Sequence, residues 1–137
     1  METISAGQLK ALKFFHRLPL EFVQTLLNAG HIQDIPKKSL LFSSGENIQN
    51  VLILLSGEVS VYNITKHGQR KILFFLGKGH LLNHDINSSH SLSLSCESIT
   101  PVLVLKISKK NFLGFMKESF PLTQAVLDEY ERYLWRL

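Results

Sequence analysis

Three histidines lie close together in one short stretch of the sequence: His80, His84 and His90. Histidine is the commonest protein ligand of metal ions, and it also holds haem iron. The stretch contains no His-x-His pair, and the sequence places no third ligand beside them. We therefore expect loop histidines at the surface, with a metal or haem site as the alternative. A cupin-like metal enzyme, which needs a denser set of histidines and glutamates, is a further alternative.

Glu46 and Glu58 each follow a glycine, and two such carboxylates are the residue types of a general acid and base. Without a nearby base or metal, we expect them to contact backbone amides or solvent, and we expect no enzyme. Cys96 is the only cysteine, which excludes an internal disulfide and suits a reducing cytoplasm. It lies in an apolar stripe, so we expect an inert, buried thiol.

The composition indicates one folded domain over residues 1–137. Hydrophobic residues make up 45% of the 137 residues and charged residues 19%. No apolar run approaches the roughly 20 residues that span a bilayer, so no membrane partner is expected. The net charge is +4, and the lysines are spread in pairs. A nucleic-acid footprint is normally more concentrated, so we expect these residues not to bind DNA themselves.

The apolar spacing predicts N-terminal helices over 1–30, strands over 31–107 and C-terminal helices over 108–137. The first helix is expected to carry the apolar positions Leu9, Leu12, Phe14, Phe15 and Leu18. Pro19 is expected to open a second helix, which Gly30 closes. The predicted fold class is mainly β with flanking helices: an antiparallel β-roll or jelly-roll barrel.

Glycines are expected where the chain turns sharply between strands, because glycine adopts positive φ without steric cost. The expected turn residues are Gly45, Gly57, Gly68 and Gly79. Residues 51–55 are apolar at every position and are predicted to form an inner strand. In the next strand we expect Val59 and Val61 to point inward, and Ser60 and Tyr62 outward.

The C-terminal helices carry a dimerisation prediction. Ser108 is expected to cap the first of them, and Ser119 to open a longer one. One apolar line on the longer helix, which we assign to a homodimer interface, consists of Val126, Tyr130, Tyr133 and Leu137. A second line joins Leu127 and Leu134, so that one line packs on the domain and the other on a partner. Trp135 is expected either to anchor an interface or to cover the strands.

Three stretches carry a family resemblance: LLFSSGE (40–46), VLILLSGEVSVY (51–62) and HGQRKILFFLGKGHLL (67–82). They resemble the effector domain of the Crp/Fnr family of bacterial transcription regulators, which has the cyclic-nucleotide-binding fold. The resemblance extends from Phe15 to Leu137. It implies a ligand-sensing domain in which a ligand within the strands shifts the terminal helices, and with them attached DNA-binding domains.

The resemblance also implies where a ligand would bind. Family members that bind cyclic AMP carry a Glu for the ribose hydroxyl and an Arg for the cyclic phosphate. Here these positions fall near His84 and Leu92, and no arginine lies between Arg70 and Arg132. We therefore expect no response to cyclic AMP. The candidate pocket residues are His80, Leu82, His84, Leu92, Ser93 and Leu94. Either leucines fill this pocket, or it accepts an apolar or planar small-molecule effector such as haem.

The resemblance also implies that the chain is part of a longer protein. The DNA-binding domain of that family would begin where this sequence ends. We therefore expect a truncated chain, with DNA bound only through a domain that is absent from it. A stand-alone, ligand-free dimerisation or protein-docking module is the alternative.

Overall fold

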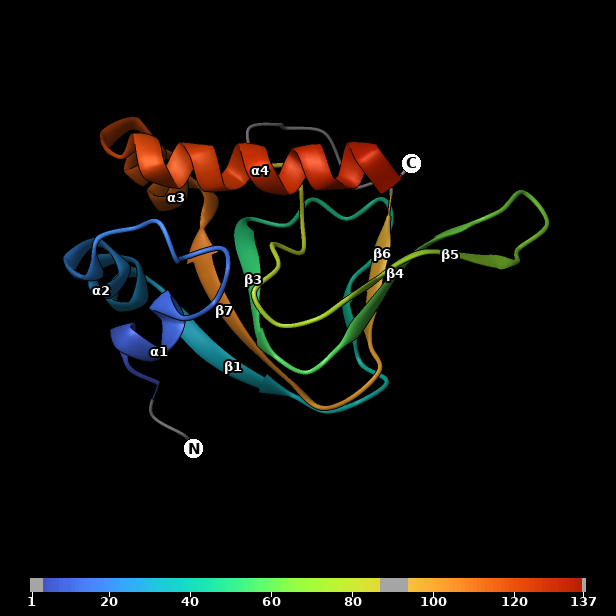
Figure 1. Cartoon of the computed structure of the whole chain (residues 1–137). Helices are drawn as coiled ribbons and strands as arrows, with labels where there is room; N and C mark the ends of the chain where they lie inside the picture. Colours follow the sequence, from blue (N-terminus) through green and yellow to red (C-terminus); the bar gives the residue numbers. More distant parts are fainter. Residues whose placement is uncertain (1–3, 87–93, 137) are drawn as a thin grey trace.

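The computed structural model describes residues 4–86 and 94–136 of the chain (Figure 1). Its helices are α1 (Ala6–Lys10), α2 (Leu20–Ala29), α3 (Lys109–Glu118) and α4 (Phe120–Arg136). Its strands are β1 (His31–Ile35), β2 (Leu40–Phe42), β3 (Asn50–Ser56), β4 (Val59–Ile64), β5 (Arg70–Leu76), β6 (Ser95–Ser98) and β7 (Val102–Ser108). Helices flank a central region of strands, which confirms the predicted fold class. None of the helices in the described ranges is long and apolar enough to cross a membrane.

The strands form two antiparallel sheets, one in the order β1-β7-β3 and the other in the order β2-β6-β4-β5. In the first sheet Ile53 lies opposite Leu105. In the second, the hairpin of β4 and β5 pairs Ile64 with Arg70 and projects away from the body of the domain (Figure 1). Among the described residues no strand pairing joins the two sheets. The β-roll is therefore confirmed, whereas the expectation of a closed barrel is wrong.

Strand β3 divides the interior into two cores, because successive side chains of a strand point to opposite faces. Val51, Ile53 and Leu55 face the helices and belong to an apolar cluster that we call the helix-side core. Leu52 and Leu54 face the second sheet and belong to a cluster that we call the roll core. This arrangement explains why every position of the strand is apolar, and it makes β3 an inner strand as predicted.

The N-terminal segment differs from the prediction, because α1 ends at Lys10. From there the chain continues in turns that close three residues apart. The amides of Leu12, Phe15 and Leu18 donate to carbonyl oxygens three residues earlier, at 2.9, 3.0 and 3.0 Å. Such turns bring every third side chain to the same side. The spacing of Leu9, Leu12 and Phe15 therefore fits these turns as well as an α-helix.

Gly30 ends α2, as predicted, but for a different reason from the usual helix cap. Its φ is −110°, an extended conformation that any residue adopts. A Cβ atom at this position would lie 2.6 Å from the carbonyl oxygen of Lys106 in β7. The glycine is needed because the helix end approaches the sheet closely.

Positive φ occurs at all four glycines expected in turns. The φ angles are 90° at Gly45, 91° at Gly57, 79° at Gly68 and 87° at Gly79. At Gly57 a Cβ atom would also overlap the carbonyl oxygen of Pro101. Any larger residue there would strain both the turn and its neighbour.

Two side chains of β4 are covered although they were expected to point outward. Ser60 and Tyr62 are not part of the roll core, which contains Val59 and Val61, yet they are only 6% and 5% exposed. The guanidinium carbon of Arg70 lies 4.0 Å from the centre of the Tyr62 ring. The same guanidinium binds the Glu97 carboxylate at 2.7 Å. A surface ion pair therefore covers the Tyr62 ring, which alternation alone did not reveal.

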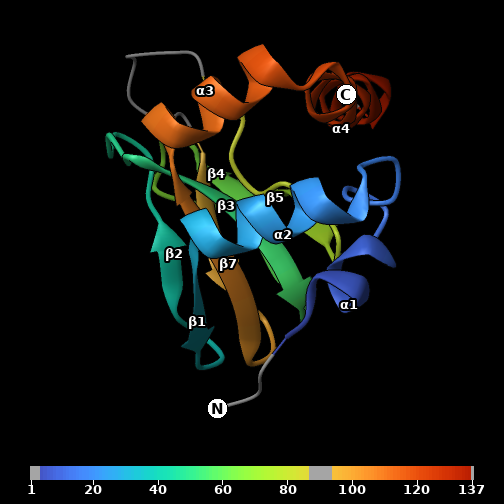
Figure 2. The same ribbon diagram turned by 90° about the vertical axis from the view of Figure 1, so that its left-hand side faces the viewer.

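The helices pack against the face of the first sheet that is turned away from the second sheet. Helix α2 contacts β7, and α3 contacts both β3 and β7. Helix α4 crosses above the strands and ends over the second sheet (Figure 1). Figure 2 looks along α4 and shows α3 running toward it. This placement sets α4 against the segment that follows β5, where the candidate site lies.

Candidate functional site

The segment after β5 is held against β3 by backbone hydrogen bonds. The amide of Gly79 donates to the Leu54 carbonyl at 2.7 Å, and the amide of Leu54 donates to the His80 carbonyl at 2.9 Å. The amide of Leu82 donates to the Leu52 carbonyl at 2.8 Å. Because side chains alternate, this pairing buries Leu82 in the roll core. Of the candidate pocket residues, Leu82 is thus part of the packed interior.

His80 and His84 are partly buried and both lie near α4, so the expectation of surface loop histidines is wrong for these two. The Nδ1 atom of His80 lies 3.3 Å from Oε2 of Glu129, a carboxylate that is only 2% exposed. The His84 ring lies 3.9 Å from the Tyr133 ring, centre to centre, and 5.3 Å from the Tyr130 ring. The third histidine of the stretch, His90, lies outside the described residues.

His84 is an uncharged imidazole in this setting. Burial lowers its pKa from 6.5 to about 4, although the Glu129 and Asp85 carboxylates act in the opposite direction. Its Nε2 atom is buried and has no hydrogen-bond partner within residues 4–86 and 94–136. A neutral imidazole is the form that binds metals, but no group of three His, Cys, Asp or Glu side chains that could hold a metal ion occurs among the described residues.

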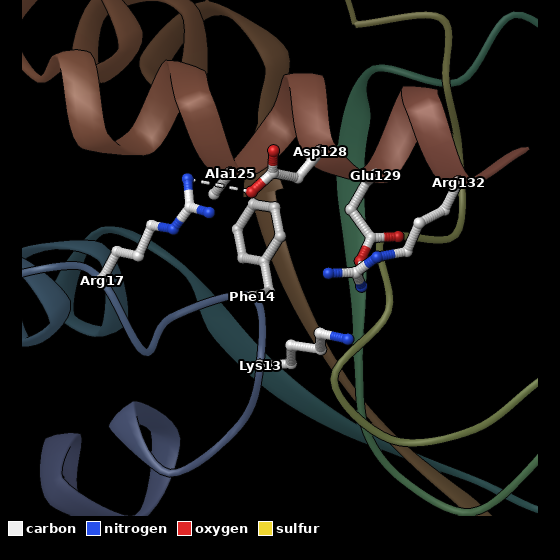
Figure 3. A pocket seen from close by; sticks show the side chains of 7 residues that line it. All are labelled: Lys13, Phe14, Arg17, Ala125, Asp128, Glu129 and Arg132. Atoms are coloured by element: carbon white, nitrogen blue, oxygen red, sulfur yellow. Dashed lines mark hydrogen bonds and ion pairs between the residues drawn. The ribbon is translucent and has the colours of Figure 1, made fainter. Parts of the chain in front are cut away.

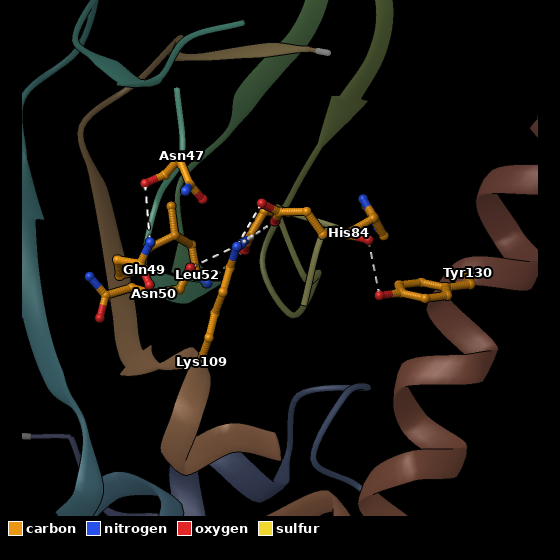
Figure 4. A network of polar contacts seen from close by, with 9 residues as sticks. Asn47, Gln49, Asn50, Leu52, His84, Lys109 and Tyr130 are labelled. Carbon is orange, nitrogen blue, oxygen red and sulfur yellow. Dashed lines mark hydrogen bonds and ion pairs between the residues drawn. The ribbon is translucent and has the colours of Figure 1, made fainter. Parts of the chain in front are cut away.

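Helix α4 is tied to the candidate segment by two tyrosines. The Tyr130 hydroxyl donates to the His84 carbonyl at 3.1 Å (Figure 4). The Tyr133 hydroxyl donates to the Leu81 carbonyl at 3.2 Å. Burial, together with the nearby Asp85 carboxylate, raises the pKa of the Tyr130 hydroxyl. It therefore stays protonated and donates over the whole neutral range.

These contacts reverse the predicted roles of the two apolar lines on α4. Val126 is 2% exposed, and Val126, Tyr130 and Tyr133 pack against the chain's own cores, so the assignment of this line to a partner is wrong. Its fourth member, Leu137, lies outside the described residues. The exposed apolar side chains of α4 are Phe120 (67%), Leu127 (50%), Leu134 (69%) and Trp135 (88%). Trp135 therefore does not cover the strands.

A buried polar network fixes the other end of the segment (Figure 4). Asn83 accepts a hydrogen bond from the Leu52 amide at 2.8 Å and donates to the Asn50 carbonyl at 2.9 Å and to the Asp85 carboxylate at 3.0 Å. Asp85 in turn pairs with Lys109, the first residue of α3, at 2.7 Å, and both side chains are 10% exposed. This network was not predicted, and its only signal in the sequence is the polar stretch of residues 83–85 between Leu82 and Ile86.

A second set of charges joins α4 to the N-terminal segment (Figure 3). Arg17 pairs with Asp128 at 3.0 Å. Glu129 accepts a contact from Arg132 at 3.5 Å beside a cavity of about 10 Å³, which is the space of one water molecule. The Glu129–Arg132 contact lies within α4, so the contacts that join α4 to other segments here are Arg17 with Asp128 and His80 with Glu129.

The roll core consists of apolar side chains from both sheets. Its buried members are Phe42, Leu52, Leu54, Val59, Val61, Phe74, Leu76, Leu82, Cys96, Val102 and Val104. Leu94, which directly precedes β6, packs against this core and is partly buried. Leu92 and Ser93 lie outside the described residues. Burial raises the pKa of the Cys96 thiol to about 12, so the thiol is protonated and unreactive, as expected.

The described residues do not fit a cyclic nucleotide in the roll core. A buried cyclic phosphate requires a cationic partner. Among the lysines and arginines whose side chains the structure describes, Lys109 is the only buried one, and it already pairs with Asp85. His84 is uncharged near neutral pH because its pKa is about 4. Residues 87–93 contain no lysine or arginine in the sequence.

The two glutamates of the Gly-Glu pairs hold turns. Glu46 accepts a hydrogen bond from the Ser43 amide at 2.9 Å, as expected. Glu58 is exposed, and its backbone carbonyl accepts from the Ile99 amide at 2.8 Å. Neither arrangement assembles a general acid and base.

Residues 32–119 match the family of the cyclic nucleotide-binding domain, so the chain belongs to this family. The family consists of regulatory domains and not of enzymes. No curated protein matches the chain.

Solved structures with the same fold include two transcription regulators. Catabolite Activator Protein from Thermus thermophilus is 21% identical, with a TM-score of 0.79, and the match covers 88% of this chain and 57% of that protein. The sensor domain of the transcriptional regulator DNR from Pseudomonas aeruginosa is 23% identical, with a TM-score of 0.77, and the match covers 93% of this chain and 87% of that domain. Whole DNR is matched over 62% of its length. The chain thus has the fold of a Crp/Fnr-like effector domain and spans about three fifths of the length of the whole regulators.

Proposed function

We propose that the chain is the effector domain of a Crp/Fnr-type transcription regulator, and that it dimerises and does not respond to cyclic AMP. The observation that carries this proposal is the apolar roll core. A phosphate buried among these side chains would lack a cationic partner, which is unfavourable by several kcal/mol. Leucine, valine and phenylalanine side chains occupy the roll core instead.

In the proposed mechanism, α4 transmits changes in the candidate segment. The hydroxyls of Tyr130 and Tyr133 bind backbone carbonyls of this segment, so a shift of the segment moves α4 directly. DNA is bound only through a further domain that α4 positions. The single, unreactive Cys96 agrees with a cytoplasmic location.

Dimerisation through the outer face of α4 is supported by its exposed apolar side chains. Phe120, Leu127 and Leu134 are each at least half exposed and lie seven residues apart. A heptad spacing keeps such a line facing a parallel partner helix along its whole length. In a dimer this line would be buried, whereas in a monomer it exposes three large apolar side chains.

The dimer is tested with Leu134→Glu, which places a carboxylate in the proposed seam. We expect the wild-type chain to sediment as a dimer and the variant to dissociate at least about tenfold more readily. Ile64→Glu is the matched control, because Ile64 is 53% exposed and lies far from α4 at the end of β4. Equal sedimentation of the wild type and both variants would contradict dimerisation through α4.

The main alternative is a ligand-free docking module in which the roll is only a scaffold. In a variant of the proposed function, an apolar or planar effector such as haem occupies the roll. The absorption spectrum after addition of haemin distinguishes this variant from the docking module. The docking module predicts no spectral change and no ligand-dependent movement of α4.

A further inference from the structure

An open groove lies between α3 and α4, outside both sheets. Its volume is about 660 Å³, which is within the usual range for small-molecule sites. Leu113 and Met116 of α3 and Val126 and Leu127 of α4 form an apolar floor. Ile86 and Tyr130 complete the wall at the candidate segment. The groove is therefore separate from the roll core and in contact with the residues that tie α4 to the domain.

Gly114 opens this groove at a cost to the stability of α3. It lies in the interior of the helix, where a glycine is less stable than an alanine by roughly 0.5–1 kcal/mol. Its φ is not positive, and a Cβ atom there would meet no atom within 4 Å. None of the residues that the structure describes thus requires a glycine at this position. Its missing side chain leaves room for an occupant.

The charges along the groove indicate the kind of occupant. Lys110 and Lys117, two turns apart on α3, both line it, and both side chains are exposed. None of its lining residues in the described part of the chain is acidic. An apolar floor flanked by two ammonium groups favours a molecule with an apolar body and an anionic end over a neutral or cationic one.

We propose that the groove between α3 and α4 binds a small amphiphilic carboxylate, a free aliphatic acid whose chain lies on the floor and whose carboxylate meets Lys110 or Lys117. The site goes beyond the proposed function, since it does not depend on what the roll core holds; it shares Leu127 with the proposed dimer seam, so that a dimer would cover one edge of the groove. Its occupant would touch Tyr130, whose hydroxyl holds the His84 carbonyl. Binding would therefore stabilise the docked position of α4.

The test is calorimetric titration of the chain with dodecanoate, compared with the variant Gly114→Leu. The new side chain fills the groove, and we expect the affinity to fall by at least about tenfold. Because leucine has a higher helix propensity than glycine, the variant should melt at or above the wild-type temperature, so lost binding is not lost folding. Asn111→Leu is the matched control: it adds the same side chain to an exposed position of α3 outside the groove and should bind dodecanoate like the wild type.

Two further arms make the test decisive. The double variant Lys110→Glu, Lys117→Glu should lose affinity for dodecanoate and gain affinity for dodecyltrimethylammonium. Equal binding of dodecanoate by the wild type and Gly114→Leu would overturn the proposal. It would also be overturned if the wild type bound the two amphiphiles equally, or if Gly114→Leu changed the oligomeric state and left dodecanoate binding unchanged. The last result would assign the groove to a second copy of the chain.

Discussion

Among the described residues, the roll core is occupied by side chains, whereas the groove between α3 and α4 is open. In the roll core, β3 and its neighbours place a large apolar side chain at each inward position, as Leu52 and Leu54 illustrate. The groove, which Gly114 of α3 lines, has a volume of about 660 Å³ and lies outside both sheets.

The two regions are joined by the segment from Gly79 to Ile86. Its first half pairs with β3, and its second half meets α4 through the carbonyl of His84. Asp85 fixes it to Lys109 at the start of α3. Any movement of α3 or α4 therefore reaches the edge of the roll core through a few polar contacts.

Shortening a side chain in the roll core should have the largest effect on the free energy of unfolding. Leu54 is fully buried, and Leu54→Ala should lower the free energy of unfolding by about 3–5 kcal/mol, because it removes buried methyl groups and leaves a cavity. Urea denaturation measures the change. Ile72→Ala, at a position that is 46% exposed, is the control and should stay within about 0.5 kcal/mol. A loss below about 1 kcal/mol for Leu54→Ala would mean that the roll core is loosely packed and not closed.

Breaking the ion pair of Asp85 and Lys109, which joins the segment to α3, should have the next largest effect on the free energy of unfolding. Asp85→Asn leaves Lys109 buried without a counter-charge and should cost about 2–4 kcal/mol in urea denaturation. Arg17→Gln breaks an ion pair whose arginine side chain is 51% exposed, and it should cost at most about 1 kcal/mol. If both variants lost the same stability, the buried pair would not be the element that fixes the segment.

The pH dependence of stability probes the contact between α4 and His84. The pKa of His84 is about 4 in the folded chain and 6.5 as a free side chain, so its contribution to stability is complete above pH 6.5 and is lost as the pH falls toward 4. Between pH 7.5 and pH 5 this loss is roughly 2 kcal/mol. His84→Phe should remove it, since the ring contacts with Tyr133 remain and no proton binds. Parallel pH profiles for wild type and variant would show that His84 is not buried against α4.

Most of the fold was predictable from the sequence, because it rests on local patterns. Apolar residues at every position of 51–55 indicated an inner strand. Gly45 and Gly57 indicated the turns before and after this strand. The end of α1 was not predictable, because a spacing of three residues fits consecutive tight turns as well as a helix. The burial of Tyr62 was not predictable, because the Arg70 side chain that covers it comes from another strand.

The site was less predictable, because it depends on which elements meet in space. The two apolar lines of α4 were visible in the sequence, but their roles depend on how the helix is rotated about its axis, and this is set by tertiary contacts such as those of Tyr130. The burial of Asp85 and Lys109 was not predictable, since burial of either is favourable only beside the other. The place of Gly114 in the groove was not predictable either, because it depends on how α3 and α4 pack.

The most direct test of the account is a thermal melt of the chain with and without saturating cyclic AMP. A ligand at about 100 times its dissociation constant adds about 2.7 kcal/mol of stability, which raises the midpoint of a domain of this size by about 10 °C. A filled, uncharged roll core predicts the same midpoint in both samples. A rise of about 10 °C would contradict it, and would mean that a cyclic phosphate binds the domain without a buried lysine or arginine.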